Sequence, residues 1–322
     1  DDAISVQQTS DGGYIFVGST HSYGAGHWDV YLVKTDFTGV PEWTRVYGGV
    51  ADDRGTWVEQ TTDGGYIVSG YTESFAPYRG VYLIKTDSQG DTLWTRALDA
   101  SGCYFAVGKH VQQTLDGGYI VTGWSTCNPD PGSYDDDVIL IKTDANGDTV
   151  WTRHFGGGYP DWGHSVRQTS DSGYLAVGFW ESREPYDLDV YLIKTDSQGD
   201  SLWTRTYGGG MPDVGANVLV NADGTCIVSG ETKSCGAGSI DFYLVKIDPS
   251  LQGIVRGDGN GDGAVNSSDV VYLINYLFRD GSPPEPPIAG DANCDGLVGV
   301  EDLIYLINYL FAGGTEPGCE CA

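Results

Sequence analysis

The first 250 residues alternate short runs of β-branched and aromatic residues with turns rich in glycine and aspartate. Residues 5–9 and 14–18 form two such runs, and an Asp-Gly-Gly turn that begins at Asp11 separates them. Runs of this length and composition predict β-strands, and glycine accommodates the positive φ that a tight hairpin turn requires. Two more strands are predicted, at residues 29–34 and around the Trp-Thr-Arg sequence that begins at Trp43.

This unit of four predicted strands repeats along the chain. The turn aspartate returns at regular intervals, as Asp11, Asp63, Asp116, Asp171 and Asp223. The Trp-Thr-Arg sequence returns in the first four units only, at Trp43, Trp94, Trp151 and Trp203. Four strands in a unit of roughly 50 residues are typical of a propeller blade, and the coils of a β-solenoid are shorter. Residues 1–250 are therefore predicted to form a mostly-β domain, a five-unit β-propeller of four-stranded blades.

The fifth unit lacks its Trp-Thr-Arg strand, and its blade can be completed in three ways. Residues 253–255 are one candidate for a substitute strand, and a piece of chain that precedes Asp1 is another. The third is a strand from a neighbouring molecule, which would build a filament. Each would cover a sheet edge that otherwise invites pairing with other chains.

Residues that recur in every unit are expected to be scaffold, and function is expected in the loops that vary. The repeated tryptophans are predicted to pack between blades. The arginine two residues after each tryptophan is expected to pair with a repeated carboxylate, such as Asp36, Asp87, Asp144 or Asp196. Aromatic residues in the variable loops are candidates to stack on sugar rings, which makes a carbohydrate a possible ligand: Trp124, Tyr134, Trp180 and Tyr186.

The charge of the chain narrows the classes of partner. Asp and Glu number 45 against 17 Lys and Arg, which gives a formal net charge of −28. Nucleic acid and anionic membrane surfaces attract basic residues, so both are disfavoured. No run of about 18 apolar residues occurs in the sequence, so no membrane-spanning helix is predicted. The charge fits a secreted, extracellular protein that meets divalent cations.

Seven cysteines favour an oxidising compartment and disulfide bonds. The predicted pairs are Cys103 with Cys127, Cys226 with Cys235, and Cys294 with one of the two cysteines near the C-terminus. The odd number leaves one thiol over, for which Cys321 is the candidate. No CxxC pair occurs and the five histidines are scattered, which argues against a zinc site.

Residues 258–269 and 291–302 have the spacing of calcium-binding loops. Calcium takes about six to eight oxygen ligands, which such a loop supplies from side chains at positions 1, 3, 5 and 12 and a main-chain carbonyl at position 7. The first loop offers Asp258, Asn260, Asp262, the carbonyl of Ala264, and Asp269. The second loop offers Asp291, Asn293, Asp295, the carbonyl of Leu297, and Asp302. Two Ca²⁺ ions are therefore predicted.

A helix is predicted after each loop, because the sequence Tyr-Leu-Ile-Asn-Tyr-Leu-Phe begins at Tyr272 and returns unchanged at Tyr305. Each loop ends in aspartate and lacks a full helix before it, and a proline-rich linker at 283–287 joins the two halves. In these features residues 257–322 resemble type I dockerin domains. The resemblance implies docking onto a cohesin-like or neighbouring extracellular protein.

The resemblance also implies that loop positions 10 and 11 select the partner. These are Ser267 and Ser268 in the first half and Val300 and Glu301 in the second. Because the two pairs differ, a symmetric, two-way mode of binding is not expected.

The sequence thus predicts a propeller at 1–250, a linker at 251–256 and a dockerin-like domain at 257–322. We expect a non-catalytic scaffold, adhesion or assembly protein that docks through its C-terminal module, with self-association as a further possibility. The alternative is a carbohydrate-active hydrolase or lyase that carries a dockerin. Such an enzyme would need a pair of carboxylates that face one pocket, and the sequence singles out none.

Overall fold

The computed structural model describes residues 1–100, 102–127, 136–181, 188–234, 239–247, 257–261, 264–285, 287–293 and 297–314. The chain divides into two compact units, residues 1–247 and 248–322. The first unit contains only β-strands, and the second contains only helices and loops, within the described ranges.

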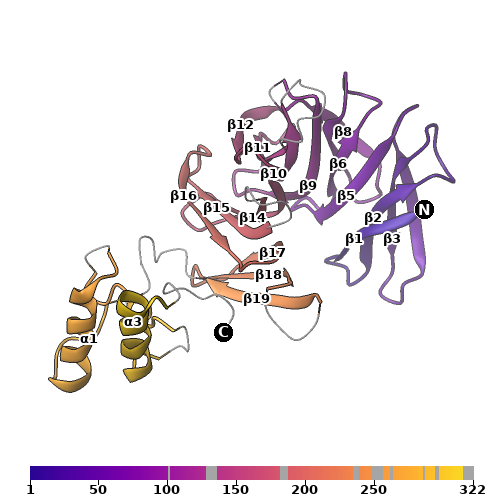
Figure 1. Ribbon diagram of the computed structural model, residues 1–322. Helices are drawn as coiled ribbons and strands as arrows, with labels where there is room; N and C mark the ends of the chain where they lie inside the picture. The colour runs from indigo at the N-terminus through magenta and orange to yellow at the C-terminus, as the bar shows by residue number, and fades with distance from the viewer. Residues whose placement is uncertain are drawn as a thin grey trace. The chain divides into compact units, whose positions relative to one another are not determined.

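Five antiparallel sheets make up the first unit (Figure 1), and we number them in chain order. Sheet 1 contains β1 (Asp2–Gln8), β2 (Tyr14–Thr20), β3 (Asp29–Thr35) and β4 (Pro41–Tyr47). Sheet 2 contains β5 (Asp53–Gln60), β6 (Tyr66–Thr72), β7 (Gly80–Thr86) and β8 (Thr92–Leu98). Sheet 3 contains β9 (Phe105–Gln113), β10 (Tyr119–Thr126), β11 (Asp136–Thr143) and β12 (Thr149–Phe155). Sheet 4 contains β13 (Trp162–Gln168), β14 (Tyr174–Glu181), β15 (Leu188–Thr195) and β16 (Ser201–Tyr207). Sheet 5 contains β17 (Asp213–Val220), β18 (Cys226–Thr232) and β19 (Asp241–Ile247).

In sheets 1 to 3 the Asp-Gly-Gly turn and the repeated lysine stabilise the hairpin together. In sheet 1 the carboxylate of Asp11 accepts the N–H of Gly13 at 2.9 Å, and Gly12 has the positive φ of 86° that the turn requires. The buried ammonium of Lys34 lies 2.9 Å from Asp11 and 2.9 Å from Glu42. A buried lysine needs such partners, because an unpaired charge in the interior is costly. The same lysine–aspartate pair recurs in sheets 2, 3 and 4.

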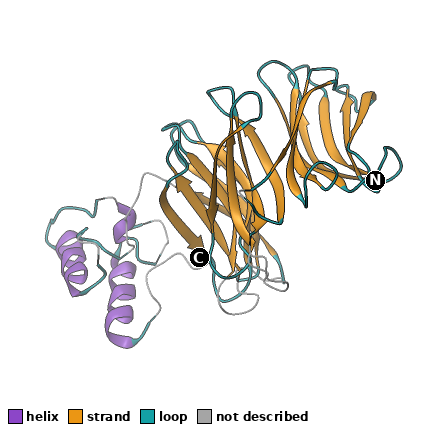
Figure 2. Ribbon diagram, turned by 90° about the horizontal axis from the view of Figure 1, so that it is seen from above, coloured by secondary structure: helices purple, strands orange, loops and turns teal. Residues whose placement is uncertain are grey.

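Consecutive sheets pack against each other. Figure 2 shows the strands of the first unit from above. The repeated tryptophan of one sheet contacts the tyrosine after the turn of the next, as predicted for packing between blades. Ring centroids are 5.9 Å apart for Trp43 and Tyr66, and 5.7 Å apart for Trp94 and Tyr119. The predicted mostly-β, propeller-like fold is confirmed, whereas the number of blades in a closed ring stays a prediction.

The repeated arginines pair with repeated carboxylates, as predicted, but the aspartates named as examples were wrong. Arg45 pairs with Asp91, at 3.1 Å, and not with the aspartate at the start of a turn. That aspartate, Asp36 in sheet 1, instead accepts backbone N–H groups of its own turn, from Thr38 and Val40. The true partner ends the corresponding turn of the following sheet, so each ion pair joins two sheets.

The first strands of the sheets lie toward a common axis. β5, β9 and β13 contact one another in series, and Arg167 of sheet 4 reaches Glu59 of sheet 2 at 3.3 Å. Both side chains of this pair are largely buried. His110 on β9 is fully buried nearby, with its ring 4.3 Å from that of Trp57. Sheets that are not neighbours in sequence therefore meet at their first strands, as in a propeller.

Sheet 5 differs from the other sheets in two respects. It has three strands among the described residues, and residues 253–255, the candidate substitute strand, lie outside the described ranges. Among the strands that the structure describes, those of sheets 1 and 5 do not pack closely on each other, whereas each sheet packs closely on the sheet that follows it in the chain. Figure 1 shows β1 and β19 at opposite ends of the series of sheets.

The second unit contains α1 (Ser267–Phe278), the short α2 (Pro287–Gly290) and α3 (Val300–Ala312). Asn266 caps α1 by accepting the N–H of Ser268 at 2.8 Å, and Gly313, with a positive φ of 71°, caps the C-terminal end of α3. The core of this unit is formed by Leu273 from α1, Ala292, and two leucines from α3, Leu303 and Leu306.

Candidate calcium-binding and docking site

The first predicted calcium loop is organised by its last aspartate. The Oδ1 atom of Asp269 accepts the backbone N–H of Asn260 at 3.2 Å, and its Oδ2 atom accepts that of Asn266 at 2.8 Å. Asp258, at the start of the loop, is buried together with Asp269. The carbonyl of Ala264 accepts the side-chain amide of Asn266 at 3.1 Å. The carboxylate therefore fastens the loop to the first turn of α1.

The second loop repeats this arrangement on α3. Asp302 accepts the N–H of Asn293 through Oδ1 at 3.1 Å and the N–H of Gly299 through Oδ2 at 2.8 Å. Burial raises the pKa of Asp302, and the negative charge of Asp291 raises it further. The first and last aspartates of this loop thus lie close enough to repel each other.

The donor set fits a hard divalent cation. Buried carboxylates are normally paired with a cation or bound to a metal, because an isolated buried charge is costly. Asp258 and Asp269 in one loop, and Asp291 and Asp302 in the other, are buried carboxylates. Oxygen donors at this spacing are the ligands that calcium prefers. The predicted ligands Asp262 and Asp295 lie outside the described residues.

The four predicted partner-binding residues lie at the first turns of the two long helices and are exposed: Ser267, Ser268, Val300 and Glu301. Beyond them the helices differ. The exposed side of α3 carries an apolar stripe at helical spacing: Val300, Ile304, Ile307 and Phe311. On α1, the exposed large hydrophobic residues are only Val271 and Phe278. An exposed apolar stripe of this kind is typical of a surface that a partner covers.

Among the described residues, the predicted sugar-stacking residues of the repeat domain do not form a common flat surface on which a sugar could stack. Trp124 is engaged within the domain, stacked on Trp162 with ring centroids 5.2 Å apart. Trp180 packs against the core between sheets 3 and 4, and Tyr134 and Tyr186 lie outside the described residues. A carbohydrate ligand therefore stays a prediction.

A cavity of about 330 Å³ lies between sheets 3 and 4, lined in part by Trp151, Tyr174, Asp116 and Lys142. The carboxylate of Asp116 is 2.9 Å from the ammonium of Lys142. Equivalents of these residues recur in the other sheets. The cavity is therefore lined by residues of the repeated scaffold.

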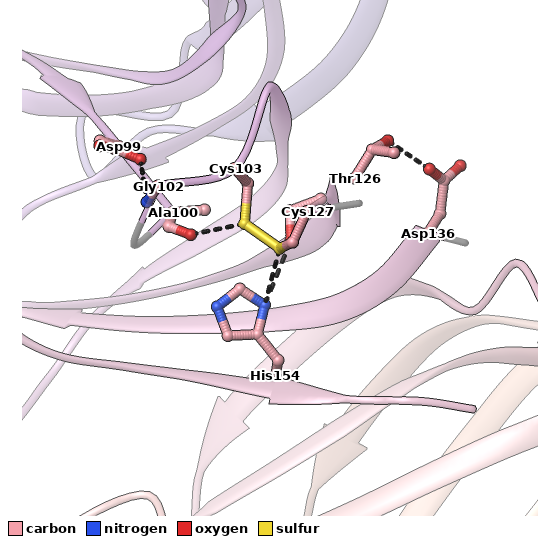
Figure 3. The surroundings of a disulfide bond; sticks show 9 residues. Asp99, Ala100, Gly102, Cys103, Thr126, Cys127, Asp136 and His154 are labelled. Atoms are coloured by element: carbon pink, nitrogen blue, oxygen red, sulfur yellow. Dashed lines mark hydrogen bonds between the residues drawn. A yellow bond between two sulfur atoms is a disulfide. The ribbon is translucent and has the colours of Figure 1, made fainter. Parts of the chain in front are cut away.

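The predicted Cys103–Cys127 disulfide is confirmed (Figure 3). It joins the connection between β8 and β9, which contains Cys103, to the end of β10, which Cys127 follows. His154 of β12 points toward it, with Nδ1 3.8 Å from the sulfur of Cys127 and 3.2 Å from the hydroxyl of Ser125. Sequence spacing gave no signal for this neighbour, because β12 is remote from both cysteines along the chain. The other predicted pairs involve cysteines outside the described residues.

Residues 256–311 match the family model described as dockerin type I domain. The molecule therefore has a dockerin module that follows a propeller-like repeat domain. Dockerin domains bind calcium and dock onto cohesins, and they are extracellular modules, so calcium and a protein partner are supported in general terms. Within the described residues, no helix has the length and apolar character needed to cross a membrane.

Comparisons of the whole chain concern the fold. The solved structure of a protein of unknown function from Dyadobacter fermentans is similar to this chain, with a TM-score of 0.54 and 13% sequence identity. The similarity covers 78% of this chain and 80% of that protein's chain. An endo-arabinase from Bacteroides thetaiotaomicron is 12% identical, with a TM-score of 0.45, over 76% of this chain and 93% of its own. The arabinase is too distant to carry an argument about activity. Among curated proteins, regulatory protein FlaEY of Caulobacter vibrioides is 25% identical over 183 residues, 47% of this chain and 19% of FlaEY. The chain thus covers less than a fifth of that relative's length.

Proposed function

We propose that this protein is a secreted, non-catalytic scaffold or adhesion protein that assembles on an extracellular partner through calcium-dependent docking of residues 257–322. One observation carries the proposal: both loops bury their first and last aspartates and lead directly into helices with exposed residues at the partner-selecting positions. The repeat domain has five sheets, which we interpret as blades. Docking of the C-terminal module would attach this domain to the partner and leave it accessible to other molecules.

We assign one calcium ion to each loop. In the first, the ligands are Asp258, Asn260, Asp262, the carbonyl of Ala264, and Asp269. In the second, they are Asp291, Asn293, Asp295, the carbonyl of Leu297, and Asp302. A cation in each loop would offset the mutual repulsion of the carboxylates and fix the start of the following helix. Calcium would therefore be required for the docking surface to form.

Docking is expected to use α3 more than α1. The apolar stripe that begins at Val300 continues along α3 as Ile304, Ile307 and Phe311, whereas α1 begins with Ser267 and Ser268. Burial of apolar side chains supplies most of the binding free energy in such helical interfaces. The difference between the helices supports one preferred orientation of the partner over two equivalent ones.

The alternative, a carbohydrate-active hydrolase or lyase, gains no support from the described cavity. Glycoside hydrolysis needs two carboxylates that are free to face the substrate. Asp116, which lines the cavity, is held by Lys142, and Asp144 accepts two backbone N–H groups of its own turn.

Binding to a panel of type I cohesin domains, measured by calorimetry in calcium and again in excess EGTA, tests the proposal. We expect at least one cohesin to bind in calcium and the binding to be lost in EGTA. If no member binds in calcium, or if EGTA leaves the affinity unchanged, the proposed docking function is wrong.

A further inference from the structure

Sheet 3 departs from the repeat at two positions that the other sheets fill with ordinary scaffold residues. His154 pairs with Ile139, which pairs in turn with Gly123, and the equivalent position in sheets 1, 2 and 4 holds Val46, Ala97 and Thr206. Cys127 lies four residues after Gly123, and the equivalent position in sheets 1, 2 and 5 holds a serine: Ser22, Ser74 and Ser234. The chain therefore replaces two scaffold residues of sheet 3 with a histidine and a cysteine.

These two residues and Cys103 bring three possible metal-ligand atoms to one point. A ring nitrogen of His154 and the sulfurs of Cys103 and Cys127 all lie within 4.8 Å of one another. Figure 3 shows the imidazole ring turned toward the disulfide, with Nδ1 3.8 Å from the sulfur of Cys127. The same nitrogen is 3.2 Å from the hydroxyl of Ser125, which helps to hold the ring in this orientation.

The sheet, and not the disulfide, holds the histidine in place. Residues directly opposite each other in a sheet share a face, as do residues two apart along one strand. Ser125 follows Gly123 at that interval, so Ser125 and His154 lie on the same face of sheet 3. Cys103 packs against the apolar core between sheets 2 and 3. Opening of the disulfide therefore leaves the ring beside the two sulfurs.

The three groups are the kind of ligands that zinc binds. Zn²⁺ prefers thiolate sulfur and imidazole nitrogen, but two sulfurs that are bonded to each other are not thiolates. A small thiol opens the bond by exchange: two molecules of it form a disulfide, and the protein disulfide takes up two electrons and two protons. Zinc then displaces the two protons into solvent. Burial lowers the pKa of His154, so its neutral ring keeps a lone pair for the ion.

We propose that Cys103, Cys127 and His154 form a binding site for Zn²⁺ once a small thiol has reduced the disulfide. In oxidising surroundings a covalent bond joins the entry to sheet 3 with the end of β10. In reducing surroundings the ion joins the same two segments to β12, and its fourth position is open to water. The sequence shows no zinc motif because the three residues come from separate segments of the chain. The site belongs to the repeat domain and is independent of the calcium loops and of the proposed docking.

A cobalt titration of the reduced full chain tests the proposal, because Co²⁺ replaces Zn²⁺ in such sites and absorbs strongly when thiolate sulfur binds it. The protein is reduced with dithiothreitol, freed of it under argon and kept in excess calcium, which fills the calcium loops. Wild-type protein should show the thiolate-to-cobalt absorption, and Zn²⁺ should abolish it. His154→Gln removes one of the three ligands and should weaken cobalt binding at this site by about tenfold or more.

His27→Gln is the matched control, since His27 is an exposed histidine between β2 and β3 of sheet 1. It should bind Co²⁺ as the wild type does. The other cysteines are present in all three proteins, so the difference between wild type and His154→Gln belongs to this site. Cys127→Ser, a second variant, removes a thiolate and should lose the same part of the absorption.

The redox dependence provides the second half of the test. Without reduction, wild type and His154→Gln should give the same spectrum with Co²⁺, because the sulfurs are not available. Equal cobalt affinity and absorption in reduced wild type and reduced His154→Gln would overturn the proposal. A difference between the two proteins that is as large before reduction as after it would also overturn the proposal, because the thiolates would then not be ligands.

Discussion

Asp302 accepts a hydrogen bond from the backbone N–H of Asn293, 3.1 Å away, across nine residues of chain. The same relationship joins Asp269 to Asn260 in the first loop, at 3.2 Å. One carboxylate therefore fixes both the calcium loop and the start of the following helix. Since such a buried carboxylate favours a cation nearby, the loop, the helix and the docking surface are expected to form together.

The first prediction concerns the choice between the two docking helices. Ile304→Asp places a charge in the apolar stripe of α3 and should weaken cohesin binding by about 2 kcal/mol or more, roughly 30-fold. Val271→Asp is the matched change at the equivalent position of α1 and should cost less than about threefold. Calorimetric titration of both variants with the cohesin bound by the wild type is the measurement. Equal losses would indicate two equivalent binding modes and contradict the preference for α3.

The second prediction concerns acid sensitivity of the repeat domain. Burial, and to a smaller extent the charge of Arg167, lowers the pKa of His110 well below its usual 6.5. The unfolded chain then binds the proton more readily than the folded protein does. The stability that neutral His110 contributes is therefore complete above pH 6.5 and is lost as the pH falls below it, by up to about 1.4 kcal/mol per pH unit.

The check is to compare wild type with His110→Gln, which does not titrate, by denaturant unfolding at pH 7.5 and pH 5.5. Other histidines titrate in both proteins, so the difference between the two free energies of unfolding isolates His110. We expect the wild type to lose about 1 kcal/mol more than the variant on acidification. An equal loss in both proteins would show that His110 is not buried in its neutral form.

The third prediction concerns the Cys103–Cys127 bond. It closes a loop with a sequence separation of 24 residues, for which loop-closure entropy gives a stabilisation of about 3 kcal/mol. The double variant Cys103→Ser, Cys127→Ser should therefore unfold at a clearly lower urea concentration than the wild type. Its calcium affinity should be unchanged, because the bond belongs to the repeat domain. A midpoint equal to that of the wild type would contradict a structural role for this disulfide.

Local features were predictable from the sequence, and contacts between sheets were less so. The turn at Asp11 and the loops that begin at Asp258 and Asp291 depend on the spacing of a few neighbouring residues, which the sequence displays directly. The partner of Arg45 is Asp91, which belongs to the next sheet, and its identity depends on the offset between two packed sheets. No local pattern encodes that offset.

The proximity of His154 to the disulfide was missed for the same reason. It results from the register of β11 and β12, in which His154 pairs with Ile139.

The measurement that tests the central claim most directly is far-ultraviolet circular dichroism of the full chain during a calcium titration that starts from the EGTA-treated protein. We predict that the helical signal of α1 and α3 is absent in EGTA and returns with calcium, while the strand signal of residues 1–247 stays constant. A helical signal that is the same in EGTA and in calcium would contradict the account, because the two helices would then form without the ion.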